Sequence, residues 1–98
     1  MKDLLKHINK IFDHRIRLGI MSTLMVNDSI DFKELKHLLG ITDGNLASHI
    51  KALEQARYIL VKKQFIGKKP NTKYTATQIG KKAFKSHIEA LEKIINNT

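Results

Sequence analysis

The sequence predicts a single α+β domain, mostly α-helical, with five helices and one hairpin of two or three strands. Along most of the chain, apolar residues recur every three or four positions, a spacing that places them on one face of a helix. β-Branched and aromatic residues are concentrated instead in residues 58–76, the pattern of a strand pair. A length of 98 residues suffices for one modest core but not for two, so residues 1–98 are expected to form one domain.

Two helices are expected in the first quarter of the chain. The first is predicted over about residues 3–13, where five apolar residues recur at helical spacing: Leu4, Leu5, Ile8, Ile11 and Phe12. The second is predicted from Ile16 to about Val26, and the polar residues 27–29 follow it as a turn.

Two short helices joined by a tight turn are expected next. Residues 29–31 can form at most a short edge strand, and Asp31 then caps a helix that Gly40 ends. Glu34 stands three residues after Asp31, in the capping-box position. Thr42 caps the following helix, predicted over about residues 43–56, with Leu46, Ile50 and Leu53 on its inward face. Such a pair forms a helix-turn-helix.

A basic hairpin and a long last helix complete the prediction. Residues 58–61 and 65–66 are predicted as strand, with lysines between them, residues 67–71 as a turn, and residues 72–76 as the returning strand. Thr77 then caps a helix over about residues 78–96.

The net charge of +9 is concentrated in one third of the chain. Residues 55–87 contain nine basic residues and no acidic one, whereas basic and acidic residues balance elsewhere. Such an asymmetry predicts a polyanionic partner. The alternative is a lysine-rich solvated face that binds nothing.

Several function classes are excluded by residues that the chain lacks. It has no cysteine, which excludes disulfides and thiolate zinc sites. No nucleophile elbow, phosphate loop or paired-carboxylate motif is present, so neither an enzyme activity nor a cofactor is expected. No metal site is expected, because no His-x3-His pair occurs among its five histidines: His7, His14, His37, His49 and His87. Apolar runs are too short for a membrane span or secretory signal, so a cytoplasmic location is expected.

Residues 14–91 resemble the winged helix-turn-helix DNA-binding domains of the MarR/ArsR-like class of prokaryotic transcriptional regulators, in particular its small single-domain members. The resemblance rests on residues 31–36, 39–50 and 53–54, on the wing at residues 67–74, and on a Thr-x-x-Gly start to the last helix at residues 77–80. It implies a homodimer that binds operator DNA, with the helix at about 43–56 in the major groove. The basic wing at about 62–73 would contact the adjacent backbone or minor groove.

One residue departs from the family pattern. Members of the family usually have glycine after the recognition helix, where this chain has Arg57. A non-glycine residue in a left-handed helix cap costs about 1 kcal/mol. Either the helix ends differently here, or Arg57 gains a contact with an anion.

The candidate DNA contacts fall into two groups. A helix that enters the groove end-on uses its N-terminal half, so the candidate base readers are Asn45, Ser48 and His49. Asparagine can pair with adenine through two hydrogen bonds, whereas lysine suits phosphate contact. Contacts to the DNA backbone are expected from Thr42, Gly44, Lys51, Lys62, Lys68, Lys69 and Lys73. Solvated polar residues with no ligand are the alternative.

The outer helices carry more apolar surface than a helix-turn-helix core requires. This surplus predicts a homodimer built from the first and last helices through Leu4, Ile8, Ile11, Phe84, Ile88, Leu91 and Ile95. The alternative is that these residues pack on the chain's own core.

Two other functions fit the same sequence. One is a winged-helix protein-interaction module of a larger assembly, in which an acidic partner meets the wing. The other is binding of structured RNA. A membrane-surface role fits poorly, because the basic residues lie on a hairpin rather than along one amphipathic helix. The sequence does not identify a small-molecule effector.

Overall fold

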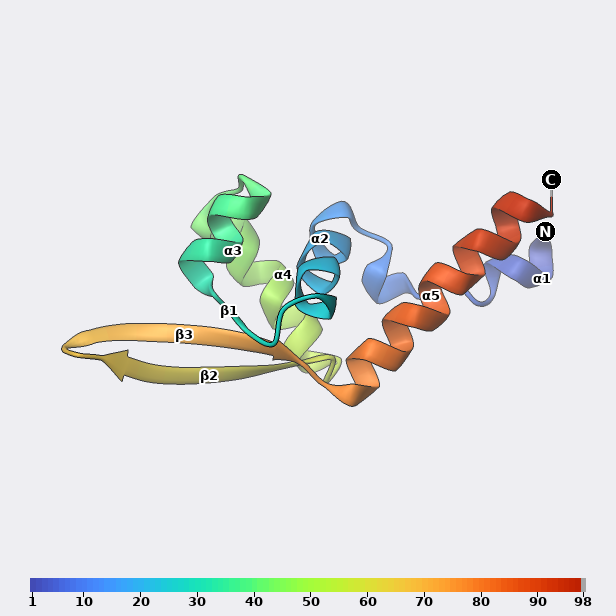
Figure 1. The fold of residues 1–98 in the computed structure, drawn as a ribbon. Coiled ribbons are helices and arrows are strands. Elements are labelled where there is room, and N and C mark those ends of the chain that lie inside the picture. Colours follow the sequence, from blue (N-terminus) through green and yellow to red (C-terminus); the bar gives the residue numbers. More distant parts are fainter. Residues whose placement is uncertain (98) are drawn as a thin grey trace.

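The computed structural model describes residues 1–97, and Figure 1 shows the fold. The elements in chain order are α1 (Lys2–Leu5), the 3-10 turn η1 (Lys10–Phe12), α2 (Arg15–Met25), β1 (Ile30–Asp31), α3 (Phe32–Leu39), α4 (Asp43–Gln55), β2 (Ile59–Ile66), β3 (Lys69–Ala76) and α5 (Gln78–Asn96). The sheet is antiparallel in the order β1-β3-β2. The predicted fold class, mostly helical with a winged hairpin, is confirmed.

Three helices begin at the residues that the sequence predicts. The side chains of Asp31, Thr42 and Thr77 each accept a hydrogen bond from the backbone N–H three residues later, at 2.8, 3.2 and 2.8 Å. Gly40 ends α3 in the left-handed conformation, with φ of +62°. These caps satisfy N–H groups that would otherwise lack a partner, which explains why the boundaries could be predicted.

The predicted first helix over residues 3–13 is wrong, because the chain turns at Asn9. This residue is extended (φ −85°, ψ 116°), and its side chain caps η1 by accepting from the Ile11 N–H at 2.9 Å. Its backbone N–H donates to Nδ1 of His87 at 3.0 Å, and its amide nitrogen donates to the Tyr58 hydroxyl at 3.0 Å. The turn places Phe12, which is fully buried, in the core.

An aromatic cluster surrounds Phe12. Its ring stacks on Tyr58 with centroids 5.1 Å apart, meets Phe84 edge-on at 5.2 Å, and lies 5.5 Å from the His87 ring. His87 is only 2% exposed, and this burial lowers the pKa of its imidazole despite the opposing effect of Asp13. The neutral ring can therefore accept the Asn9 hydrogen bond that fixes the N-terminal segment on α5.

We expect acid to destabilise the fold through His87. Its pKa in the folded state lies below the unfolded value of about 6.5. The unfolded state therefore binds more protons in this range, and stability falls as the pH drops below about 6.5. Thermal denaturation should show a lower Tm at pH 5.5 than at pH 7.5. His87→Gln should reduce that difference and His37→Gln, at an exposed site on α3, should retain it; equal behaviour of the two variants would contradict the assignment.

The hairpin is longer, and its turn tighter, than predicted. β2 runs without a break through Lys62 and Lys63, and Lys69 already pairs with Ile66, so the turn consists of Gly67 and Lys68 alone. Gly67 has φ of +65°, the conformation that glycine supplies at the first position of a two-residue hairpin turn. Pro70 fits within β3 because β1 pairs only with Tyr74 and Lys73, which leaves Pro70 on an edge.

The structure shows how α4 ends at Arg57. The Tyr58 N–H donates to the Leu53 carbonyl at 3.0 Å and the Arg57 N–H to the Glu54 carbonyl at 2.9 Å, the two bonds of a Schellman cap. Arg57 has φ of +64°, so the left-handed cap forms without glycine. The Thr77 hydroxyl donates to the Arg57 carbonyl at 2.8 Å, which joins the cap to the start of α5.

The domain is elongated, because two parts project from its core. Its radius of gyration is 14.8 Å, against about 13 Å for a compact domain of this length. The hairpin extends in one direction, and α1 lies beside the C-terminal half of α5 in the other, with both termini there (Figure 1). We call residues 2–8 and 88–96 the terminal arm. Within residues 1–97, no helix is long and apolar enough to cross a membrane.

Candidate nucleic-acid interface

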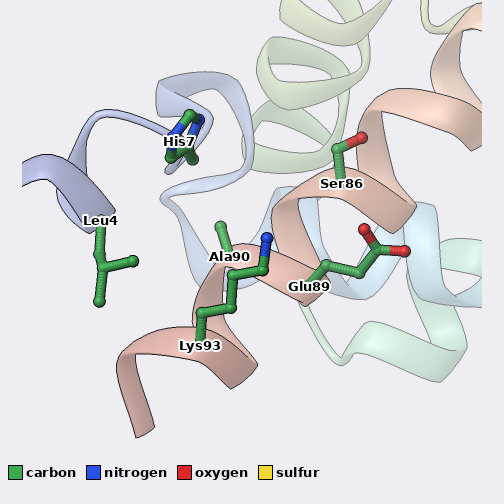
Figure 2. Close-up of a pocket in the computed structure, with 6 residues that line it drawn as sticks. All are labelled: Leu4, His7, Ser86, Glu89, Ala90 and Lys93. Atoms are coloured by element: carbon green, nitrogen blue, oxygen red, sulfur yellow. The ribbon is translucent and has the colours of Figure 1, made fainter. Parts of the chain in front are cut away.

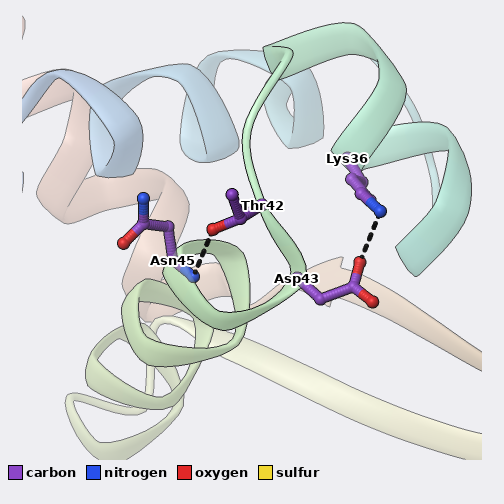
Figure 3. Close-up of polar contacts among 4 residues, drawn as sticks. All are labelled: Lys36, Thr42, Asp43 and Asn45. Carbon is purple, nitrogen blue, oxygen red and sulfur yellow. Dashed lines mark hydrogen bonds and ion pairs between the residues drawn. The ribbon is translucent and has the colours of Figure 1, made fainter.

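An ion pair fixes the turn between α3 and α4. Lys36 Nζ lies 2.8 Å from Asp43 Oδ1, and this contact joins the last turn of α3 to the first turn of α4 (Figure 3). Thr42 caps α4 at the same corner by accepting from the Asn45 N–H. The Asn45 side chain extends on the other side of the helix start from the ion pair, and its amide is not engaged by the cap (Figure 3). This corner therefore orients the first turn of α4.

The N-terminal half of α4 presents a polar face to solvent. Leu46, Ile50 and Leu53 are buried in the core, as the helical spacing predicts. Nothing lies within 4 Å of the position where a Cβ would stand on Gly44, so the backbone is open to close approach there. The predicted contact residues of this helix that are exposed are Thr42, Gly44, Asn45, Ser48 and Lys51.

His49 lies one turn after Asn45 on α4, but its side chain is half-buried against α2. Its Nδ1 accepts a hydrogen bond from Arg17 Nε at 3.1 Å, and its ring lies 4.1 Å from that of His14, centroid to centroid. Burial lowers the pKa of the His49 imidazole, and the neighbouring His14 and Arg17 lower it further. The neutral ring is half-buried between α4 and the start of α2. It therefore offers a DNA base fewer free hydrogen-bonding groups than Asn45 or Ser48 does.

The hairpin gathers the predicted lysines on one projecting ribbon. Lys62 and Lys73 are direct partners across β2 and β3, an arrangement of like charges that destabilises a sheet unless an anion lies between them. The ion pairs within residues 1–97 are Lys6–Asp3 and Lys36–Asp43, so no lysine of the hairpin takes part in one. Asp31 neighbours Lys73 in the sheet, but its carboxylate caps α3. The ribbon therefore retains its positive charge.

The residues predicted to form a dimer interface divide into two groups. Phe84 is 6% exposed and packs edge-on against Phe12, so its main contacts are within the chain's own core, and Ile11 also packs against that core. The others lie on the terminal arm, where Ile95 is 70% exposed and Leu4, Ile8, Ile88 and Leu91 are half-buried. Ile88, at the inner end of the arm, packs against the core as Ile11 does. Leu4 and Ala90 also line a shallow pocket of about 240 Å³ between α1 and α5 (Figure 2).

Sequence reasoning missed two features of the site. The Lys36–Asp43 pair spans the turn, and only the angle between the two helices brings its charges together. The other is the apolar end of the hairpin, where Phe65 is 74% exposed and Ile66 58% exposed and the sequence pattern predicts only ordinary strand. The position of Phe65 beside a glycine turn and two lysines was the available signal.

Comparisons with known proteins place this geometry in a family. The family model described as "winged helix DNA-binding domain" matches residues 16–95. An uncharacterised protein of Methanocaldococcus jannaschii is 34% identical over 88 residues, which span 90% of this chain and 96% of that protein. The structure of a transcriptional regulator homologue from Pyrococcus horikoshii OT3 is similar with a TM-score of 0.89 and 30% identity, covering 99% of this chain and 97% of that one.

A more distant structure shares the fold. A putative transcriptional regulator of the MarR family from Porphyromonas gingivalis W83 superposes with a TM-score of 0.70 at 24% identity, over 91% of this chain and 86% of that one. At this identity the similarity concerns the arrangement of helices and wing alone.

Proposed function

Because the chain belongs to the family of winged-helix DNA-binding domains, we propose that it is a cytoplasmic transcriptional regulator that binds double-stranded DNA in a sequence-specific manner as a homodimer. In this proposal α4 enters the major groove, and the hairpin contacts the adjacent backbone or minor groove. The observation that carries it is the exposed polar first half of α4 beside a hairpin whose lysines form no ion pairs within residues 1–97. The regulator homologue of P. horikoshii supports the same reading.

The shape of the site favours duplex DNA over structured RNA. The major groove of B-form DNA is about 12 Å wide and admits a helix, whereas that of A-form RNA is too deep and narrow for side chains to read. An acidic protein partner would satisfy the lysines, but it would not require exposed hydrogen-bonding groups on the first turns of α4.

The dimeric part of the proposal rests on the terminal arm. This arm projects from the core (Figure 1). Most of its apolar residues are only partly covered within the chain. A two-fold axis through the arm would place two copies of α4 to read two half-sites, as helix-turn-helix dimers do.

The test is selection of bound duplexes from random DNA at physiological salt, followed by substitutions on α4. Asn45→Ala and Ser48→Ala should each weaken binding to the selected site by about 1–3 kcal/mol and leave binding to random DNA nearly unchanged. Gln55→Ala, on the exposed last turn of α4, is the matched control and should alter neither affinity. Equal losses on both DNAs would contradict base reading by this face, and selection of no preferred sequence would overturn the proposal.

The charge at the hairpin turn predicts a distinct effect. Replacing Lys68 and Lys69 with alanine should weaken binding to the selected site and to random DNA alike. The reason is that each lysine releases about one condensed counterion on binding phosphate. The plot of log affinity against log salt should flatten by roughly one to two units, with little change in Tm. Replacing the exposed Lys2 and Lys10 changes the net charge equally and should leave the slope unchanged. An unchanged slope in the first variant would mean that the turn does not touch DNA.

A further inference from the structure

The far end of the hairpin is apolar, which phosphate contact alone does not explain. The Phe65 side chain is 74% exposed and that of Ile66 is 58% exposed. Phe65 pairs directly with Pro70 across the ribbon, and Ile66 pairs with Lys69. Since side chains alternate along a strand, Phe65 and Pro70 share one face of the ribbon, and Ile66 and Lys69 share the other. These residues lie outward of the point where β1 leaves the sheet, and Ile66 and Pro70 line one side of a pocket whose other side is the start of α3 at Phe32. Phe65 is therefore the apolar residue at this end that lies most open to solvent.

The charges around this end indicate what covers it. Residues 59–76 contain five lysines and no acidic residue. Lys68 and Lys69 follow Phe65 and Ile66 directly across the turn. An apolar group surrounded by positive charge fits a partner that offers apolar surface behind a layer of anions. Duplex DNA has this construction, because its stacked bases lie behind two rows of phosphates.

The size of the exposed apolar side chain indicates which groove of the DNA it would enter. The minor groove is about 6 Å wide, which excludes a helix but leaves room for single side chains from the end of the hairpin. Proteins that enter this groove often insert an apolar side chain between base pairs, unstacking them and kinking the duplex. Building on the proposed function, we propose that Phe65, with Pro70 beside it on the same face of the ribbon, enters the minor groove beside the α4 contact, wedges between base pairs and bends the DNA.

This role gives the hairpin a part in specificity. Pyrimidine–purine steps such as TA and CA unstack more easily than A-tracts, so a wedge favours them without forming hydrogen bonds to the bases. The preferred duplexes should therefore carry such a step at a fixed distance outside the bases that α4 reads. Lysine at the turn would not produce this preference, because phosphates are the same at every step.

The experiment measures DNA bending and affinity on the same selected duplexes, labelled at both ends for fluorescence energy transfer. Wild type should bend the duplex by about 20–90°. Phe65→Ala should remove most of the bend, weaken binding about tenfold and abolish the preference for TA over an A-tract at the flank. Leu60→Ala, at a residue 64% exposed at the base of the same strand, is the matched control and should leave all three readouts unchanged. The Lys68 and Lys69 double variant should flatten the salt dependence and keep the flank preference.

Other outcomes would overturn the proposal that Phe65 wedges between base pairs. If wild type binds its selected site but Phe65→Ala bends it equally, the wedge is wrong and the proposed function stands. If Phe65→Ala instead changes the sedimentation of the free protein, the apolar end packs against a second copy. If it abolishes binding to vesicles of anionic phospholipid and leaves DNA bending intact, the end inserts into a membrane. Failure of wild type to select any DNA sequence would overturn the proposed function itself.

Discussion

Replacing Gly80 with alanine should lower the free energy of unfolding by about 3 kcal/mol or more. A Cβ on Gly80 would stand 2.1 Å from the Tyr58 carbonyl oxygen and 2.8 Å from two other backbone atoms of that residue. Backbone atoms cannot move aside as a side-chain end can, so α5 would have to shift away from the cap of α4. Urea denaturation followed by circular dichroism measures the effect, and the Tm should fall by about 12 °C or more.

Gly44 provides the matched control for Gly80. It lies in the first turn of α4, where an added Cβ would meet nothing within 4 Å. Gly44→Ala should therefore stabilise the fold by up to about 1 kcal/mol, since alanine is the better helix former. Opposite signs for the two substitutions would support the close contact of α5 with Tyr58, whereas a neutral Gly80→Ala would show that α5 packs elsewhere.

The second large effect is expected from Leu91→Glu on the terminal arm. A carboxylate there would lie in the proposed dimer interface, and burial of an unpaired charge is costly. We expect monomers in sedimentation at tens of micromolar with most of the helical signal retained. Affinity for a two-half-site operator should fall by about a hundredfold or more, because each half-site would bind alone. Phe84→Glu cannot serve here, since Phe84 lies in the core and the variant would unfold.

Ile79→Glu is the control for the terminal arm. Ile79 is 62% exposed in the first turn of the same helix, so the substitution adds the same charge away from the arm. It should leave both the oligomeric state and the affinity unchanged. A wild-type protein that sediments as a monomer at these concentrations would contradict the homodimer.

Most of the fold could be predicted because its signals are local. Asp31, Thr42 and Thr77 cap helices through groups three residues away, and Gly40 ends a helix by its own backbone freedom. The break at Asn9 could not be predicted in this way. Its partners, Tyr58 and His87, lie 49 and 78 residues along the chain, so helical spacing alone favoured one continuous helix.

The same contrast between local signals and contacts distant in sequence applies to the candidate site. The exposed face of α4 follows from the spacing of Leu46, Ile50 and Leu53, which the structure buries as expected. The orientation of His49 depends on Arg17, which lies 32 residues away. The sequence also did not predict which residues of α5 belong to the core and which to the arm. Phe84 and Leu91 lie on one face of the helix, and the core ends between them.

The early departure of β1 from the sheet has a consequence for motion. β1 pairs only with Tyr74 and Lys73, so the hairpin is three-stranded at its base and a two-stranded ribbon beyond. Two-stranded ribbons are marginally stable in water, and segments with few buried contacts open at a small fraction of the global free energy. Amide hydrogens should therefore exchange slowly near Tyr74 and progressively faster toward Lys68. A ligand that orders the ribbon must compensate for the conformational entropy that the ribbon loses. The observed binding free energy is therefore smaller than the contacts alone would give.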